Sequence, residues 1–93
     1  YFCYGREDGS DLSISVDLDA GTASLTGEDT DDTYELTTVA ESLPPKFIFG
    51  TAQECYIGFR PSRDGTKGVA TFRCNKRKYP NALELDMDCS KQN

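Results

Sequence analysis

The chain has 93 residues, a net charge of −6 and no histidine, and 37% of its residues are hydrophobic. This length predicts a single domain over residues 1–93, with a core that is only marginally large enough. The acidic balance argues against nucleic acid as a partner, because phosphate binding needs a basic surface. No apolar run approaches the length of a membrane-spanning helix.

Four cysteines in so short a chain predict two disulfide bonds of an exported protein. A zinc site is disfavoured, because histidine is absent and no two cysteines have the close spacing typical of zinc ligands. We therefore expect a secreted or periplasmic protein, either as a free domain or as the soluble part of a larger or lipid-anchored precursor.

Turn signals about every 8–12 residues predict a succession of short β-strands. The first strand covers residues 1–5 and precedes a turn over residues 6–10. Apolar and polar side chains alternate over residues 12–18, which indicates a second strand with one buried face and one wet face. A short third strand is expected around residues 23–25.

An acidic loop over residues 27–32 separates the third strand from the fourth, which is expected over residues 33–39. The inner face of this fourth strand carries Tyr34 and Leu36, with Thr38 as a further candidate.

The next connection, over residues 40–45, contains two consecutive prolines, which cannot lie inside a hydrogen-bonded ladder. A short strand rich in phenylalanine follows over residues 46–50. The prolines restrict the backbone of the loop, which pre-organises it for insertion into a partner's cleft. A stiff link between two strands is the alternative interpretation. The candidate partner-binding residues are Glu41, Ser42, Leu43, Pro44 and Lys46.

Residues 55–74 predict a β-hairpin, because an Asp-Gly turn signal lies midway between two cysteines. This register sorts apolar side chains onto one face, whereas a slip of one residue would scramble them. Pro61 cannot donate a ladder hydrogen bond, so we expect a loop wider than two residues, with a bulge. The pairs on the apolar face are Cys55–Cys74, Ile57–Phe72 and Phe59–Ala70.

A basic turn over residues 75–81 leads to the last strand. One face of that strand is apolar, with Leu83, Leu85, Met87 and Cys89. Eight strands without helical periodicity predict a small antiparallel up-and-down β-barrel, with a β-sandwich as the alternative. If Cys55 pairs with Cys74 in the hairpin, the remaining disulfide is Cys3–Cys89, which would join the first strand to the last where the barrel closes. The other two pairings stay open at this point.

An eight-stranded barrel has room for its own side chains or for one small ligand. Here large inward side chains are expected to fill the interior. They are Leu12, Ile14, Val16, Leu25, Leu36, Phe47, Ile57, Phe59, Phe72 and Leu85.

The composition gives little support for catalysis, because without histidine no Ser-His or Cys-His nucleophilic pair can form. The carboxylates fall on wet strand faces and in turns, whereas a catalytic pair would need one member in an apolar site that raises its pKa. Residues 28–32 offer oxygen atoms of the kind that calcium prefers, but they lack the spacing of a calcium loop, so a solubilising loop is favoured. We predict no enzyme activity, no metal and no cofactor. For the basic run over residues 76–78, a charged turn is favoured over an anion-binding patch.

Several segments together resemble one known family. They are Tyr1-Phe2-Cys3, the alternating strand from Leu12 to Val16, Tyr34-Glu35-Leu36, Lys67-Gly68 with Ala70-Thr71, and Leu83 to Cys89. Their order is similar to that in the bacterial membrane-bound and periplasmic inhibitors of C-type lysozyme, which are eight-stranded barrels. That family inserts a Ser-x-Ser-Gly-Ala loop into the lysozyme active site. The corresponding interval here, residues 41–47, has no Ser-Gly pair.

We therefore expect a protein-binding module that inhibits a basic hydrolase such as C-type lysozyme. An acidic surface would steer its association with such a basic partner. The alternatives are a carrier of a small apolar ligand and a non-catalytic structural or surface-interaction domain.

Overall fold

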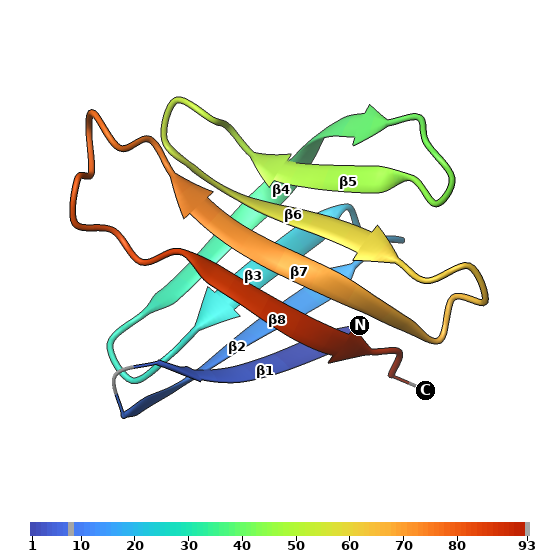
Figure 1. Cartoon of the computed structure of the whole chain (residues 1–93), viewed down its shortest axis with the longest axis horizontal. Helices are drawn as coiled ribbons and strands as arrows, with labels where there is room; N and C mark the ends of the chain where they lie inside the picture. The colour runs from blue at the N-terminus through green and yellow to red at the C-terminus, as the bar shows by residue number, and fades with distance from the viewer. Residues whose placement is uncertain (8, 93) are drawn as a thin grey trace.

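The computed structural model describes residues 1–7 and 9–92, and these form a closed antiparallel barrel of eight strands (Figure 1). The strands follow one another around the barrel in chain order. They are β1 (Phe2–Glu7), β2 (Ser10–Asp17), β3 (Thr22–Thr26), β4 (Asp31–Ala40), β5 (Lys46–Gly50), β6 (Cys55–Pro61), β7 (Lys67–Cys74) and β8 (Leu85–Ser90). The predicted barrel is confirmed, and the β-sandwich alternative is wrong.

The β6–β7 hairpin has the predicted register, from Cys55 opposite Cys74 to Pro61 opposite Gly68. The two cysteines form the predicted disulfide. The loop over residues 62–66 is wider than two residues, as expected. The register within this hairpin is continuous, so the expected bulge is absent. Pro61 needs none, because it ends β6 and the next residue, Ser62, closes the ladder by donating its backbone N–H to Lys67 O at 2.8 Å.

Closure of the barrel depends on a short contact between β1 and β8, which we call the β1–β8 seam. Only two residue pairs join these strands, Phe2 with Ser90 and Cys3 with Cys89, and the cysteines form the second predicted disulfide. Figure 1 shows the strands together near the chain ends and apart at the opposite end of the barrel. Further along the seam, Met87 packs against Gly5. A Cβ added to Gly5 would lie 3.1 Å from Met87 Cε.

The barrel interior is filled by apolar side chains from all eight strands. Eight of the ten predicted inward residues are buried, and the other two, Leu36 and Phe47, are partly buried and pack against the same cluster. The largest fully buried side chains are Phe49, Phe59, Ile14 and Ile57. The main surface grooves of the described residues are not lined by Leu12, Ile14 or Phe72. These grooves lie at the surface, outside the filled core.

The inner-face assignment of Thr38 is wrong, because a bulge interrupts the β4–β5 ladder. The register shifts between Leu36 and Thr38, which places Thr38 opposite Ile48 and leaves it exposed. The bulge is held by Thr37, whose hydroxyl donates to the backbone oxygen of Gly50 at 2.7 Å. Local alternation cannot reveal a residue inserted into the strand.

The placement of Leu83 on the last strand is also wrong, because β8 begins at Leu85 and Leu83 is 42% exposed. The β7–β8 ladder ends at the pair Phe72–Leu85. Beyond this pair, Arg73 Nη1 donates to Leu85 O at 2.8 Å, so a side-chain hydrogen bond follows the last backbone pair of the ladder.

Two predicted connections are shorter in the structure. The acidic loop covers residues 27–30, because Asp31 and Asp32 already belong to β4 and pair with β3. The predicted turn over residues 6–10 includes residue 8, which lies outside the described residues. The first and last residues of that predicted turn, Arg6 and Ser10, belong to β1 and β2.

Candidate protein-binding surface

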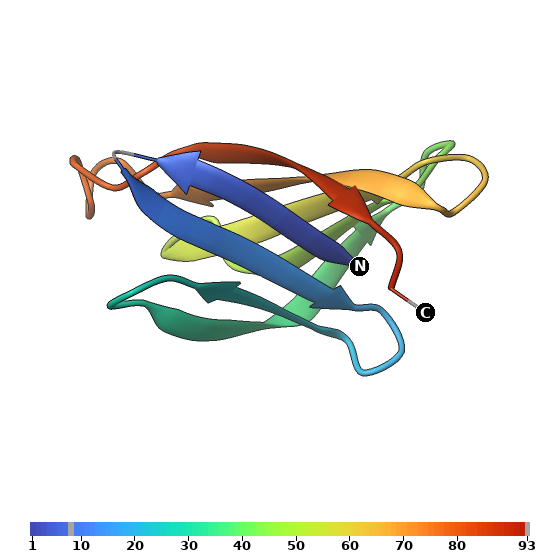
Figure 2. The same ribbon diagram turned by 90° about the horizontal axis from the view of Figure 1, so that it is seen from below.

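The loop over residues 41–45 joins β4 to β5 at the end of the barrel where both chain ends lie (Figure 2). Leu43 at its tip is 93% exposed, the highest exposure among the large hydrophobic side chains of the described residues. The Leu43–Pro44 peptide is cis, and the Ser42 hydroxyl donates to Pro44 O at 2.8 Å. A hydrogen bond and two prolines thus hold an apolar side chain out in solvent.

Leu43 borders two surface grooves. One, of about 390 Å³, is lined by Val39, Glu41, Ser42 and Pro45 in addition to Leu43. The other, of about 580 Å³, lies between this loop and the β6–β7 loop, where Pro44 and Pro45 face Pro61 and Arg63. The exposed leucine is therefore the ridge of a larger apolar surface.

Four of the five predicted contact residues, Glu41 to Pro44, lie together on this loop. Lys46 does not, because it is the first residue of β5 and its side chain crosses the outer face of the sheet. A Cβ built on Gly58 would lie 3.0 Å from Lys46 Cε. Lys46 lines a separate groove there with Arg60 and Thr71.

Sequence reasoning missed the residues that the β6–β7 hairpin contributes beside the loop, namely Arg60, Pro61, Arg63 and Lys67. A signal was available, because in an up-and-down barrel alternate connections lie at the same end. The β4–β5 and β6–β7 connections lie at the same end of the barrel, as Figures 1 and 2 show, and both line one groove there.

The β6–β7 loop is held by Asp64. Its Oδ1 accepts hydrogen bonds from the Ser62 hydroxyl at 2.6 Å, the Thr66 hydroxyl at 2.8 Å and the Thr66 backbone N–H at 3.1 Å. These bonds favour the ionised carboxylate and lower its pKa from 3.8 to about 2, with Ser62 contributing most. Gly65 follows with φ +73°, a conformation that suits glycine.

Charge is segregated along the chain and therefore around the barrel. Residues 1–45 contain eleven acidic side chains and one basic one, whereas residues 46–93 contain five acidic and nine basic ones. Because the strands follow chain order, β1–β4 form an acidic wall and β5–β7 a basic one, while β8 carries Asp86 and Asp88 and no cation. The net charge of −6 is the sum of two halves with opposite signs.

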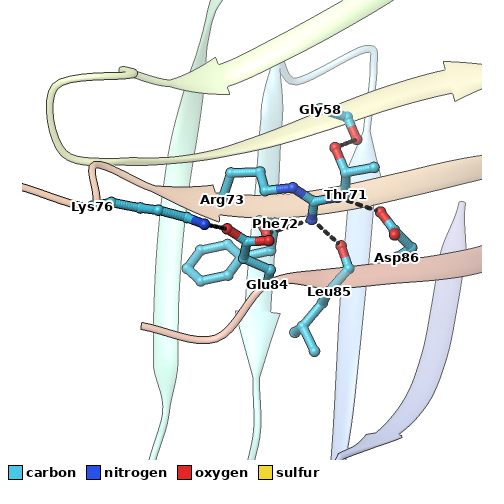
Figure 3. A network of polar contacts seen from close by, with 8 residues as sticks. All are labelled: Gly58, Thr71, Phe72, Arg73, Lys76, Glu84, Leu85 and Asp86. Carbon is cyan, nitrogen blue, oxygen red and sulfur yellow. Dashed lines mark hydrogen bonds and ion pairs between the residues drawn. The ribbon is translucent and has the colours of Figure 1, made fainter. Parts of the chain in front are cut away.

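The basic run over residues 76–78 lies at the opposite end of the barrel, and two of its cations are paired. Lys76 Nζ lies 2.9 Å from Glu84 Oε1, and Lys78 pairs with Glu54. Figure 3 shows the first pair beside Arg73, which donates to Phe72 O, Leu85 O and Asp86 Oδ1. Hydrogen bonds from these lysines lower the pKa of Glu84 and of Glu54. Most of the cations in this region therefore form ion pairs or hydrogen bonds within the chain.

Among the described residues, potential metal ligands do not cluster and charged groups are not buried. No group of three or more potential metal ligands is assembled among these residues, so the carboxylates of the acidic loop are not gathered around a point. No polar or charged residue among them is buried. A carboxylate with the raised pKa of a general acid would need such a buried, apolar setting.

Comparison of the chain with protein-family models, curated proteins and solved structures gave no significant match. Within the described residues, no helix has the length and apolar character of a membrane span. The assignment of function therefore depends on the surface itself.

Proposed function

We propose that this chain is a secreted or periplasmic protein-binding module that inserts the loop over residues 41–45 into the cleft of a partner enzyme. The observation that supports this most directly is Leu43, 93% exposed on a proline-restricted loop. Burying a leucine side chain in a partner contributes roughly 1.5–3 kcal/mol. A loop already restricted in shape loses little conformational entropy on binding.

The partner that we propose is a basic hydrolase such as C-type lysozyme, with this chain as its inhibitor. Residues 1–45 supply a strongly acidic wall, which would attract a basic protein over distance and raise the association rate. The resemblance of the strand layout to lysozyme inhibitors supports the same partner. Two disulfides suit an oxidising compartment such as the periplasm or the extracellular space.

The test is lysozyme activity on bacterial cell walls at low ionic strength, with this chain in stoichiometric excess. We expect inhibition that weakens as salt is added, because screening shortens the reach of the acidic wall. Unchanged lysozyme activity at low salt would exclude this enzyme as the partner.

The loop itself is tested by Leu43→Asp, which changes an exposed residue and leaves the core intact. We expect this variant to lose inhibition. Leu83→Asp is the matched control, because Leu83 is 42% exposed in the connection at the opposite end of the barrel, and it should inhibit as the unchanged chain does. Equal inhibition by both variants would show that the loop is not the contact.

A further inference from the structure

We infer that a second surface, on the outer face of β5, β6 and β7, binds an acidic segment of a protein partner. This surface, the basic groove, has a volume of about 310 Å³ and is formed by Lys46, Gly58, Arg60, Val69 and Thr71. It is distinct from the loop tip at Leu43. Its occupation does not require that the loop inhibits an enzyme.

The cations of the basic groove are not neutralised by the chain itself. Lys46 and Arg60 line it together, and Lys67 lies two residues before Val69 on β7. The four ion pairs formed among the described residues use other cations, at positions 6, 73, 76 and 78. Like charges that face one another across neighbouring strands destabilise a sheet. An anionic occupant would remove that repulsion.

The groove is open because its floor is a glycine. A Cβ at Gly58 would lie 2.9 Å from Thr71 Oγ1 and 3.0 Å from Lys46 Cε, so any larger residue would fill the space. Arg60 and Val69 also line a neighbouring groove of about 590 Å³, which extends to Pro44. The two grooves therefore form one elongated path from the middle of the sheet to the base of the exposed loop.

The path combines positive charge with aliphatic surface. Val69 is 46% exposed, Pro44 and Pro61 border the path, and Asp88 is its one carboxylate. An extended peptide that alternates carboxylates with aliphatic side chains complements both features. A sulfated polysaccharide would match the charge but would leave the aliphatic side chains without apolar contacts. The observations therefore favour an acidic peptide.

The test uses two end-capped synthetic peptides, Glu-Leu-Glu-Leu-Glu and Lys-Leu-Lys-Leu-Lys, titrated into the isotope-labelled chain at low ionic strength. We expect the acidic peptide to shift the backbone amide signals of Gly58, Val69 and Thr71 in two-dimensional NMR spectra. The basic peptide should leave these signals in place and should shift signals of the acidic wall instead.

A double substitution, Lys46→Gln with Arg60→Gln, should weaken binding of the acidic peptide by about tenfold, which is about 1.4 kcal/mol. Lys76→Gln with Arg77→Gln is the matched control, because it removes one lysine and one arginine at the opposite end, and it should leave the affinity unchanged. A dispersed NMR spectrum of each variant shows that it is folded. The inference is overturned if the acidic peptide shifts none of the groove signals, or if it binds the groove variant as tightly as the unchanged chain. It is also overturned if a sulfated oligosaccharide binds the groove more tightly than the peptide does.

Discussion

The β6–β7 hairpin and the β1–β8 seam each contain one disulfide, but the backbone supports them very unequally. Seven residue pairs join β6 to β7, whereas two join β1 to β8, and one of those two is the bonded Cys3–Cys89 pair. The hairpin disulfide links residues 19 positions apart, and the seam disulfide links residues 86 positions apart. The first reinforces a ladder that is already complete, while closure at the seam depends on the second.

This difference shows where a small barrel is weakest. Strand pairs that are adjacent in the chain form at little entropic cost, but closing the first strand onto the last means ordering nearly the whole chain. The seam combines that cost with the fewest pairs of any strand contact in the described barrel. Its covalent bond supplies what the hydrogen bonds do not.

The largest effect is expected from removing the seam disulfide by Cys3→Ala with Cys89→Ala. The chain-entropy relation predicts a loss of about 4.5 kcal/mol in the free energy of unfolding, to be measured by urea denaturation. Amide hydrogen exchange should accelerate first in β1 and β8. If those strands stay as protected as the hairpin does, the seam is not the weak point.

Removing the hairpin disulfide by Cys55→Ala with Cys74→Ala should cost less, about 3 kcal/mol, because the loop that it closes is shorter. In hydrogen exchange, β6 and β7 should stay among the most protected strands of this variant. A larger loss of stability here than at the seam would reverse the comparison.

Alanine substitutions at one glycine in the β6–β7 hairpin and at one in the β1–β8 seam compare how rigidly the two regions are packed. At Gly68, opposite Pro61, a Cβ would lie 2.6 Å from Cε1 of the fully buried Phe59, so Gly68→Ala should cost about 1–3 kcal/mol of unfolding free energy. At Gly5 in the seam the neighbour is the flexible Met87, so Gly5→Ala should change stability by less than about 1 kcal/mol. Urea denaturation of both variants checks the order. Equal costs would mean that the seam is packed as rigidly as the hairpin.

The smallest effect concerns the loop that joins β6 to β7. The carboxyl group of Asp64 should titrate near pH 2 in the folded chain, to be measured by NMR. Because its pKa is lower folded than unfolded, its contribution to stability is present above pH 3.8 and is lost as the pH falls toward about 2. In the Asp64→Asn variant, the free energy of unfolding should lose the part of its pH dependence that comes from this carboxyl group. In the unchanged chain, a titration midpoint near 3.8 would mean that the hydrogen bonds to Asp64 do not persist in solution.

Much of the barrel could be predicted from the sequence, because its strands are adjacent and their side chains alternate. The Asp-Gly turn and the two flanking cysteines were enough to define the β6–β7 register, and the Cys55–Cys74 pair then left Cys3–Cys89 as the second bond. The errors arose from interactions that alternation does not encode. A bulge at Thr37 turned Thr38 outward, and the Arg73 side chain ended the ladder before Leu83.

The candidate binding surface was less predictable, because half of it comes from another part of the chain. The prolines marked the loop over residues 41–45, and Leu43 is exposed as a contact residue must be. Arg60 and Pro61 come within reach of that loop only when β4, β5, β6 and β7 pair side by side. The net charge of −6 likewise hid a basic wall, since a total charge does not show that residues 1–45 and residues 46–93 have net charges of opposite sign.

Cys89 belongs both to the seam disulfide and to the lining of one groove, the one that Pro44 and Arg60 also line. If this groove binds a partner as proposed, binding and closure are thermodynamically linked. An occupant that recognises only the closed barrel raises the free energy of opening by RT ln(1 + [L]/Kd), which is about 2.7 kcal/mol at a hundredfold excess over Kd. A reductant that needs the seam to open would then act more slowly on the complex than on the free chain.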